Sequence, residues 1–232
     1  SKKNDQKFII NLLSPSWDGS RLAISLTEKG KEISEIIIID VISKRVYPEV
    51  IVNTDPANIG GIKWLEDNSG FFYVHYPVIN SVSKSYGTNI QTVLYRIGQN
   101  PKKLCTVFSR SNNLNLKIDK TAYPAVLAFN PDDKYYIGMI ADSEDFRKTF
   151  IITKVDLLKG NKNWKEFYVK EDRVHSIGLS GDDIYFTSNK LSDFAVEFRN
   201  LGGKILFIDE VHKYPDWAKE NPSYRRSAMR MY

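Results

Sequence analysis

The chain has 232 residues, of which 42% are hydrophobic and 26% are charged, and its formal net charge is +5. This balance is typical of a folded soluble domain and excludes wholesale disorder. The lysines are spread along the whole chain, which argues against a nucleic-acid-binding surface. The longest apolar run, residues 36–39, is far shorter than the ~20 residues of a membrane span, so no membrane partner is expected.

The single cysteine, Cys105, excludes an internal disulfide framework and fits either a reducing compartment or a buried thiol. The polar residues 1–6 are not followed by an apolar signal-peptide region. A soluble protein of the cytoplasm or of the periplasm agrees with these observations. We expect neither a bound metal ion nor a cofactor.

Four times along the chain an acidic turn opens into a short apolar strand, with turns beginning at residues 18, 67, 132 and 182. The period of about 50–65 residues suits four-stranded propeller blades with long loops. Gly, Asn and Asp tolerate the positive φ that short hairpins need. We therefore expect these turns to reverse the chain and to do nothing else.

Within the repeats, apolar runs bounded by turn residues predict strands. In chain order, the runs cover residues 22–26, 35–41, 46–52, 62–65, 71–76, 92–97, 103–108, 125–129, 135–141, 150–157, 166–169, 176–179 and 184–187. Ser, Asn and Gly in residues 77–91 predict a long loop between the second and third strands of the second unit. The fourth unit has sequence for two strands only.

The fold class is therefore all-β, a partial β-propeller of about three and a half four-stranded blades over residues 1–191. The composition changes after Lys190, and residues 192–232 form a short α/β-like tail with a helix-prone stretch after Pro215. A half-blade leaves unpaired backbone groups and an uncovered apolar face. We predict that Lys204–Ile208 joins the fourth sheet as its third strand, beside Ile184–Thr187.

Residues from about Ile9 to Ser188 resemble the β-propeller of the prolyl oligopeptidase family. The resemblance rests on Ser14–Ser25, on Glu35–Val41 and above all on Gly61–Pro77, with its Trp-turn-Gly-Phe-Phe-Tyr-x-x-Tyr-Pro run. A variable loop and a Leu-Tyr strand at Leu94 follow that run, as in the family. The family's propeller has seven blades, more than this chain has sequence for.

The resemblance implies a part in the cleavage of short peptides after proline. In the family, a separate α/β-hydrolase domain supplies the catalytic Ser, Asp and His, and the propeller caps the site and filters substrates by size. This chain has no Gly-x-Ser-x-Gly elbow, and its only histidines are His75, His175 and His212, so no complete triad can be assigned. We expect a non-catalytic substrate-gating or scaffold module that meets peptide through a missing hydrolase domain.

Four residues of the second unit are candidates for substrate contact. The resemblance places aromatic residues near Phe71 and Phe72 beside the family's substrate pocket, although packing inside a blade explains them equally well. His75 and Tyr76 lie next to the long insert, and loops at blade ends carry the contacts of propellers. We expect His75 itself to be an ordinary rim residue.

The tail carries a second resemblance. Gly202–Trp217 is similar to the Walker B strand of AAA-type P-loop ATPases, which implies that Asp209 would assist Mg²⁺ and Glu210 would polarise water. No Gly-x-x-x-x-Gly-Lys-Ser/Thr loop occurs in the sequence, so nothing would cradle the phosphates. Two solvated acids at the end of a buried strand are therefore favoured over an ATPase remnant.

An interaction module is the alternative function. Half a propeller leaves open sheet edges, which invite pairing with another chain or with a second copy of this one. Two incomplete families in one sequence also indicate a fused, rearranged or truncated gene product.

Overall fold

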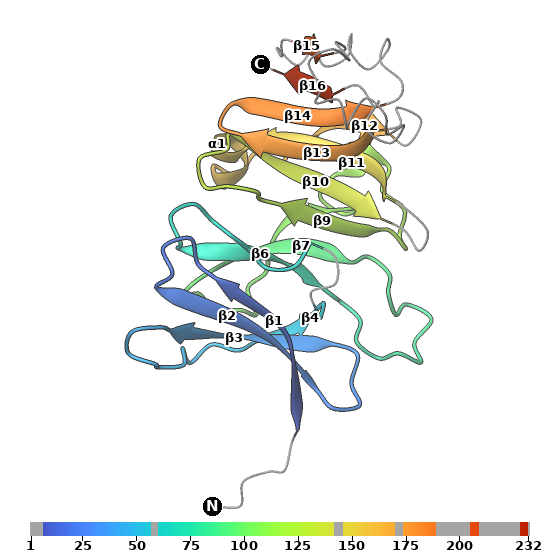
Figure 1. The fold of residues 1–232 in the computed structure, drawn as a ribbon. Helices are drawn as coiled ribbons and strands as arrows, with labels where there is room; N and C mark the ends of the chain where they lie inside the picture. Colours follow the sequence, from blue (N-terminus) through green and yellow to red (C-terminus); the bar gives the residue numbers. More distant parts are fainter. Residues whose placement is uncertain are drawn as a thin grey trace, which may run out of the picture.

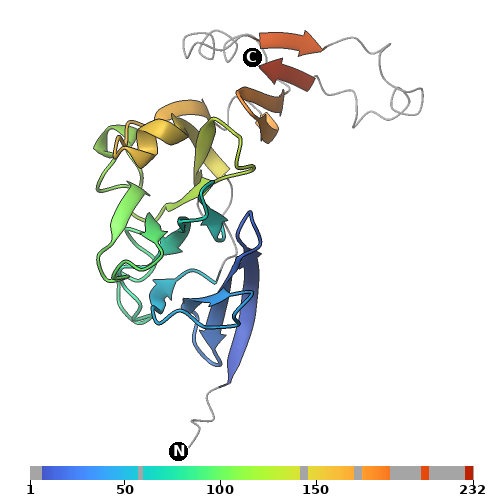
Figure 2. The same cartoon turned by 90° about the vertical axis from the view of Figure 1, so that its left-hand side faces the viewer.

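The computed structural model describes residues 7–56, 60–141, 146–169, 174–188, 205–208 and 228–231. Within these ranges the regular secondary structure is almost entirely antiparallel β-strand, arranged as one 8-stranded and two 4-stranded sheets (Figure 1; Figure 2). Four units of four strands follow one another in chain order. The predicted class, an all-β partial propeller, is confirmed.

The 8-stranded sheet contains the first two blades. Blade 1 consists of β1 (Phe8–Pro15), β2 (Arg21–Glu28), β3 (Ser34–Asp40) and β4 (Ile51–Thr54), and blade 2 of β5 (Lys63–Trp64), β6 (Gly70–His75), β7 (Gln91–Arg96) and β8 (Cys105–Ser109). A single pair, Thr54 opposite His75, joins β4 to β6. This pair turns two separate blades into one continuous sheet.

Blade 1 differs from its prediction at both ends. Its first strand, β1, has no counterpart among the predicted runs. The predicted strand at residues 46–52 is also misplaced, because regular pairing begins only at Ile51 and Val46 forms an isolated bridge with Ile39. Pro48 lacks the N–H that a ladder needs, so it separates the two pieces.

Blade 3 has the order β12-β11-β10-β9, formed by β9 (Tyr123–Leu127), β10 (Tyr135–Ala141), β11 (Phe146–Thr153) and β12 (Lys165–Val169). A 3₁₀ turn, η1 (Leu114–Leu116), precedes it. The predicted strand at 150–157 is wrong in its second half, where the helix α1 (Lys154–Leu158) begins. The Thr153 hydroxyl caps this helix by accepting a hydrogen bond from the Asp156 N–H at 3.2 Å.

The fourth sheet combines strands from the repeat and from the tail. Its order is β13 (Val174–Ser180), β14 (Asp183–Ser188), β16 (Ala228–Met231), β15 (Ile205–Ile208). The tail strand β15 therefore joins this sheet, but the prediction that it pairs with β14 is wrong, because β16 lies between them. In this order both neighbours of β16 are antiparallel to it, the slightly more stable type of pairing.

The core lies between successive blades, as β6 shows. Its odd-numbered residues Phe71 and Tyr73 pack with Ala23, Ile36 and other residues of blade 1. Its even-numbered residues Phe72 and Val74 pack toward blade 3, where Tyr136 and Ala125 lie. A strand buried on both faces has to be apolar at every position, which explains the uninterrupted run in the sequence.

The four acidic turns lie along one rim and are hydrogen-bonded to one another. The links, in chain order, are the Arg21 guanidinium to the Asn68 carbonyl at 3.2 Å, the Tyr136 hydroxyl to the Glu66 carboxylate at 2.8 Å, and the Gly181 N–H to the Asp133 carboxylate at 3.2 Å. Within the first turn, hydrogen bonds from the Ser16 hydroxyl and from Ser20 lower the pKa of Asp18 to about 2. Asp18 is thus engaged in reversing the chain, and Glu66 and Asp133 in joining blades.

Two smaller expectations concern Cys105 and the membrane. Cys105 is exposed at the start of β8, so the buried-thiol interpretation is wrong. Among the described residues, no helix has both the length and the apolar character required to cross a bilayer.

Candidate functional site

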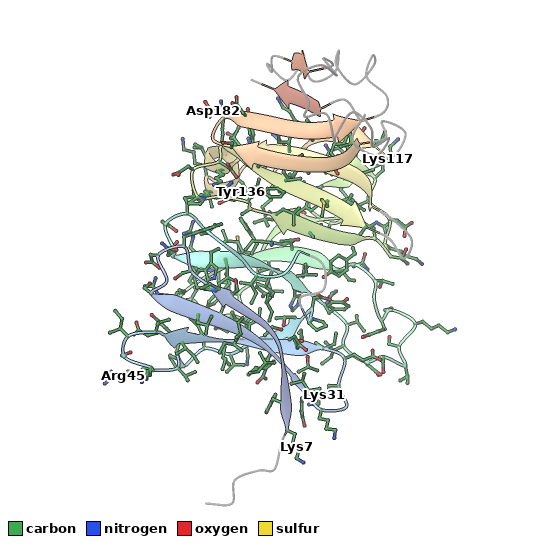
Figure 3. The ribbon with its side chains drawn as sticks, in the orientation of Figure 1. Lys7, Lys31, Arg45, Lys117, Tyr136 and Asp182 are labelled. Atoms are coloured by element: carbon green, nitrogen blue, oxygen red, sulfur yellow. The ribbon has the colours of Figure 1, made fainter. Side chains whose placement is uncertain are left out.

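The ends of the strands define two rims of different character. Figure 3 shows Asp182, from the β13–β14 turn, and Arg45, from the β3–β4 turn, on one side. Lys31, from the β2–β3 turn, and Lys117, from the connection between β8 and β9, lie on the other side. We call these sides the turn rim and the loop rim. The loop rim carries the long segment between β6 and β7, residues 76–90, together with the connections from one blade to the next. Binding residues lie disproportionately on loops, so the long loop of the loop rim makes that rim the first place to expect a ligand site.

Phe71 and Phe72 lie inside the molecule. Their exposed fractions are 0% and 1%, and they occupy two different interblade cores. Phe71 meets Trp64 edge-on with the ring centroids 5.1 Å apart, and Phe72 meets Tyr136 edge-on at 4.9 Å. Both side chains have the surroundings of core residues. That they contact a substrate stays a prediction, and their low exposure does not support it.

His75 is also buried, unlike the rim residue that the sequence predicts. Only 7% of it is exposed, its ring meets Tyr73 edge-on at 6.3 Å, and among the described residues its Nδ1 has no hydrogen-bond partner. Burial lowers the pKa of His75, and a hydrogen bond with the Val52 backbone opposes this effect. The imidazole is therefore held neutral in the seam between blades 1 and 2.

Tyr76 is the predicted residue that reaches the loop rim. It is half-buried, directly follows β6, and its N–H donates to the Asn53 carbonyl at 2.8 Å. Its hydroxyl donates to a carboxylate oxygen of Asp55 at 3.3 Å. Asp55 is buried, with 8% of its surface exposed, and also takes a hydrogen bond from the Tyr123 side chain at the start of blade 3.

The long loop adds a third tyrosine and a second carboxylate. The rings of Tyr76 and Tyr86 lie 6.3 Å apart with their planes inclined by 33°. The Tyr86 hydroxyl donates to Glu32, in the β2–β3 loop of blade 1, at 2.8 Å. We call Asp55, Glu32 and the three tyrosines the tyrosine–carboxylate cluster. It connects the loop-rim segments of blades 1, 2 and 3.

Burial and the neighbouring carboxylates keep the phenols of this cluster protonated. Burial, together with Asp55, raises the pKa of both Tyr76 and Tyr123 well above the usual range. Burial and the hydrogen bond to Glu32 raise the pKa of Tyr86. The hydroxyls therefore serve as neutral donors to the Asp55 and Glu32 side chains.

Sequence reasoning found only one member of the cluster. Tyr76 attracted attention because it adjoins the long insert. Asp55 stands in an Asp-Pro pair, and Tyr86 and Tyr123 lie in segments without a motif. Apart from Tyr76, the only sequence feature that could have indicated the cluster was the pair Asp55-Pro56 just before the connection between two blades.

The remaining predicted residues cannot be placed. Asp209 and Glu210 lie outside the described residues, as does the predicted domain boundary at 191/192. Among the described residues, no group of three or more His, Cys, Asp or Glu side chains is arranged to hold a metal ion.

The sheet order and the interblade cores define consecutive blades of a β-propeller. The sequence model described as prolyl oligopeptidase, N-terminal beta-propeller domain, matches residues 2–194. The chain therefore belongs to the prolyl oligopeptidase family, and the resemblance noted in the sequence is confirmed. A comparison with curated proteins found no match.

Solved structures of the family share the fold. A structure from a mechanistic study of two prolyl endopeptidases aligns with a TM-score of 0.63 and 18% identity, covering 81% of this chain and 26% of that one. Apo prolyl oligopeptidase B from Galerina marginata aligns with a TM-score of 0.61 and 16% identity, covering 78% of this chain and 25% of that one. The same enzyme bound to a 35mer hydrolysis and macrocyclization substrate gives 0.59 and 16%, with coverages of 78% and 26%. This chain spans about a quarter of these structures, and at such identities the likeness concerns the fold alone.

Proposed function

We propose that this chain is a substrate-contacting propeller module of a prolyl-oligopeptidase-type serine peptidase, and that it does not cleave peptides by itself. Family membership supports the peptide as substrate class, and one related structure is described with a bound peptide substrate. The sequence contains no nucleophile elbow, which supports a non-catalytic role. A hydrolase domain would supply the chemistry.

The main support for this proposal is the composition of the loop rim. It presents half-buried tyrosines around a carboxylate, whereas the opposite rim is occupied by hydrogen bonds between turns. Tyrosine combines a large apolar ring with a polar hydroxyl, and it is enriched where proteins bind other chains. Tyr76, Tyr86 and Tyr123 are therefore the residues we expect a peptide to meet first.

The test is an NMR titration of the whole chain with a short proline-containing peptide, with parallel monitoring of hydrolysis. We expect saturable shifts in residues 76–90 and at Tyr123, no shifts in the turns at residues 17–20 and 67–70, and no cleavage. Cleavage that persists after repurification would refute the non-catalytic role. Shifts confined to the turn rim would refute the assignment of the loop rim.

The exposed strand β1 favours a second candidate function, self-association. Phe8, Ile9, Ile10 and Leu13 are 43–60% exposed, and within the described residues β1 pairs with β2 alone. An apolar edge strand is a template for pairing with another chain. Light scattering during gel filtration should then show a dimer that Ile10→Lys converts to monomer. A monomer at all concentrations would exclude this function.

A further inference from the structure

One face of blade 1 is not covered by any other described blade. Blade 1 lies at the end of the row of blades in Figure 1, and its inner face packs on blade 2, where Ala23 shares a core with Phe71. Side chains alternate between the two faces along a strand, so Leu22, Ile24 and Leu26 of β2 lie on the opposite face. We call this the outer face of blade 1.

Cross-strand pairing extends the outer face across the blade, because residues directly opposite each other share a face. Three rows of paired residues result: Ile10, Leu26 and Glu35; Leu13, Ile24 and Ile37; Pro15, Leu22, Ile39 and Val46. Among the residues of these rows, Glu35 alone is charged. Ile10, Leu13 and Val46 are 54–60% exposed, and Ile37 is half-buried. The outer face is therefore a contiguous apolar surface.

Sheet faces of this composition are buried elsewhere in the chain. Between blades 3 and 4, Ile137 and Ile151 form one core with Leu179 and Ile184. A contiguous apolar surface on a folded protein marks a place where another protein packs. The outer face is thus a candidate interface, and the charges at its ends indicate what covers it.

Charges of opposite sign stand at the two ends of β3. Glu35 lies at the loop-rim end of the outer face, and Lys44 and Arg45 follow the strand at the turn rim. Within the described residues these three side chains form no ion pair. The other acids at the two ends are engaged inside the chain, Glu28 by Lys31 and Asp40 by Ser43. A second β3 that ran in the opposite direction would bring charges of opposite sign together.

The strands β1 and β2 have the reverse order of charges. Lys7 and Lys29 lie side by side at the loop rim, where the Lys29 N–H donates to the Lys7 carbonyl at 2.8 Å. Asp18 lies at the turn rim, between β1 and β2. The same reversal of direction, with β1 over β1 and β3 over β3, would therefore be favourable at both sides of the blade.

We propose that the outer face of blade 1 packs on the same face of a second copy of this chain. The two copies are related by a two-fold axis that lies between the faces and runs across the strands. Each contact then occurs twice, and Glu35 of each copy approaches Lys44 and Arg45 of the other. The inference rests on the self-association candidate above, but it assigns the contact to the face of the blade and not to the edge of β1. It does not depend on peptide binding.

The experiment measures the dimer by sedimentation velocity on the whole chain over a range of concentrations. Ile10 belongs to both the edge and the outer face, so other positions must distinguish the two modes of pairing. Ile37→Lys places a charge in the middle row of the outer face and should give a monomer. Ile9→Lys is the matched control and should remain a dimer, because Ile9 is 54% exposed on β1 but pairs with Thr27 of the inner face.

Charge reversal tests the orientation of the two copies. Glu35→Lys should weaken the dimer about tenfold, because it places like charges opposite each other at two symmetric positions. Adding Arg45→Glu to the same chain should restore most of the affinity. A double variant that is as weak as Glu35→Lys would overturn the proposed two-fold arrangement. Circular dichroism checks that every variant is folded, and the charge variants decide the matter if Ile37→Lys unfolds.

The outcomes separate this inference from the self-association candidate. A wild-type dimer that is unchanged by Ile37→Lys and Glu35→Lys but lost in Ile9→Lys would overturn packing through the face and leave pairing through the edge intact. A wild-type monomer at every concentration would overturn both, and the outer face would then be covered by a different partner. Peptide contact at the loop rim is unaffected by either result.

Discussion

Replacing Phe72 by alanine should strongly destabilise the chain, because this side chain belongs to the core between blades 2 and 3. It is 1% exposed and lies edge-on to Tyr136 with the ring centroids 4.9 Å apart. The same core cluster contains Phe108 and Phe150, whose ring centroids lie 5.7 Å apart. Removal of such a ring from a rigid core costs about 3–5 kcal/mol of unfolding free energy.

This loss is a large part of the stability of a domain, which is typically about 5–15 kcal/mol. For a chain of this size it corresponds to a fall in melting temperature of roughly 6–20 °C. The assay is urea unfolding followed by tryptophan fluorescence, with Phe72→Leu as control. Leucine fills most of the space, so this variant should lose less than half as much.

The prediction also decides between two roles of Phe72. If the side chain contacts substrate instead of the core, Phe72→Ala will lose peptide binding at nearly unchanged stability. A loss of less than about 1 kcal/mol would fall outside the range for a buried phenylalanine and would refute the packing described above. A folded, weakened protein with intact peptide binding is the result we expect.

Three further predictions concern buried groups. Because burial lowers the pKa of His75, the neutral imidazole stabilises the fold, and this contribution should be lost as the pH falls from about 6.5 towards the lower pKa of the folded state. The free energy of unfolding measured between pH 5 and 8 should therefore depend less on pH in His75→Gln than in the wild type. Lys154 donates to two backbone carbonyls at 2.9 and 2.8 Å, so Lys154→Met should cost about 1–3 kcal/mol in urea unfolding by leaving them unsatisfied. A Cβ at Gly70 would lie 2.1 Å from the Tyr95 carbonyl, so Gly70→Ala should lower the melting temperature, whereas Gly178→Ala, with open space, should change it little.

The His75 prediction has a clear contrary result. An identical pH dependence in the wild type and His75→Gln would mean that the imidazole titrates alike in folded and unfolded chains. For Lys154→Met, unchanged stability would mean that water replaces the ammonium at the two carbonyls. Similar melting temperatures for Gly70→Ala and the wild type would contradict the close approach of β6 and β7.

Strand positions could be predicted because they depend on neighbouring residues in the sequence. Residues 71–76 form an uninterrupted apolar run that predicts a strand buried on both faces, and β6 is such a strand. The failures also have local causes that the hydrophobic pattern does not register. Thr153 begins a helix by capping it, and Pro48 interrupts a ladder.

The placement of the tail strands shows a different limit. The apolar run at residues 205–208 predicts a strand, but it contains no information about its partner. The alternating Ala-Met-Arg-Met sequence of β16, about twenty residues later, competes for the same edge of β14 and occupies it. Pairing between strands is decided by the whole set of available edges.

The sequence by itself determined the all-β class, the fourfold repeat and the family, because acidic turns and apolar runs recur at regular spacing and match a known propeller. Tertiary structure alone decided which residues are available to a ligand. Phe71, Phe72 and His75 are buried by blades that lie on either side of them, and Asp55 meets Tyr123 across 68 positions of sequence. Turns and strands depend on near neighbours in the chain, whereas a site depends on segments that only the stacking of blades brings together.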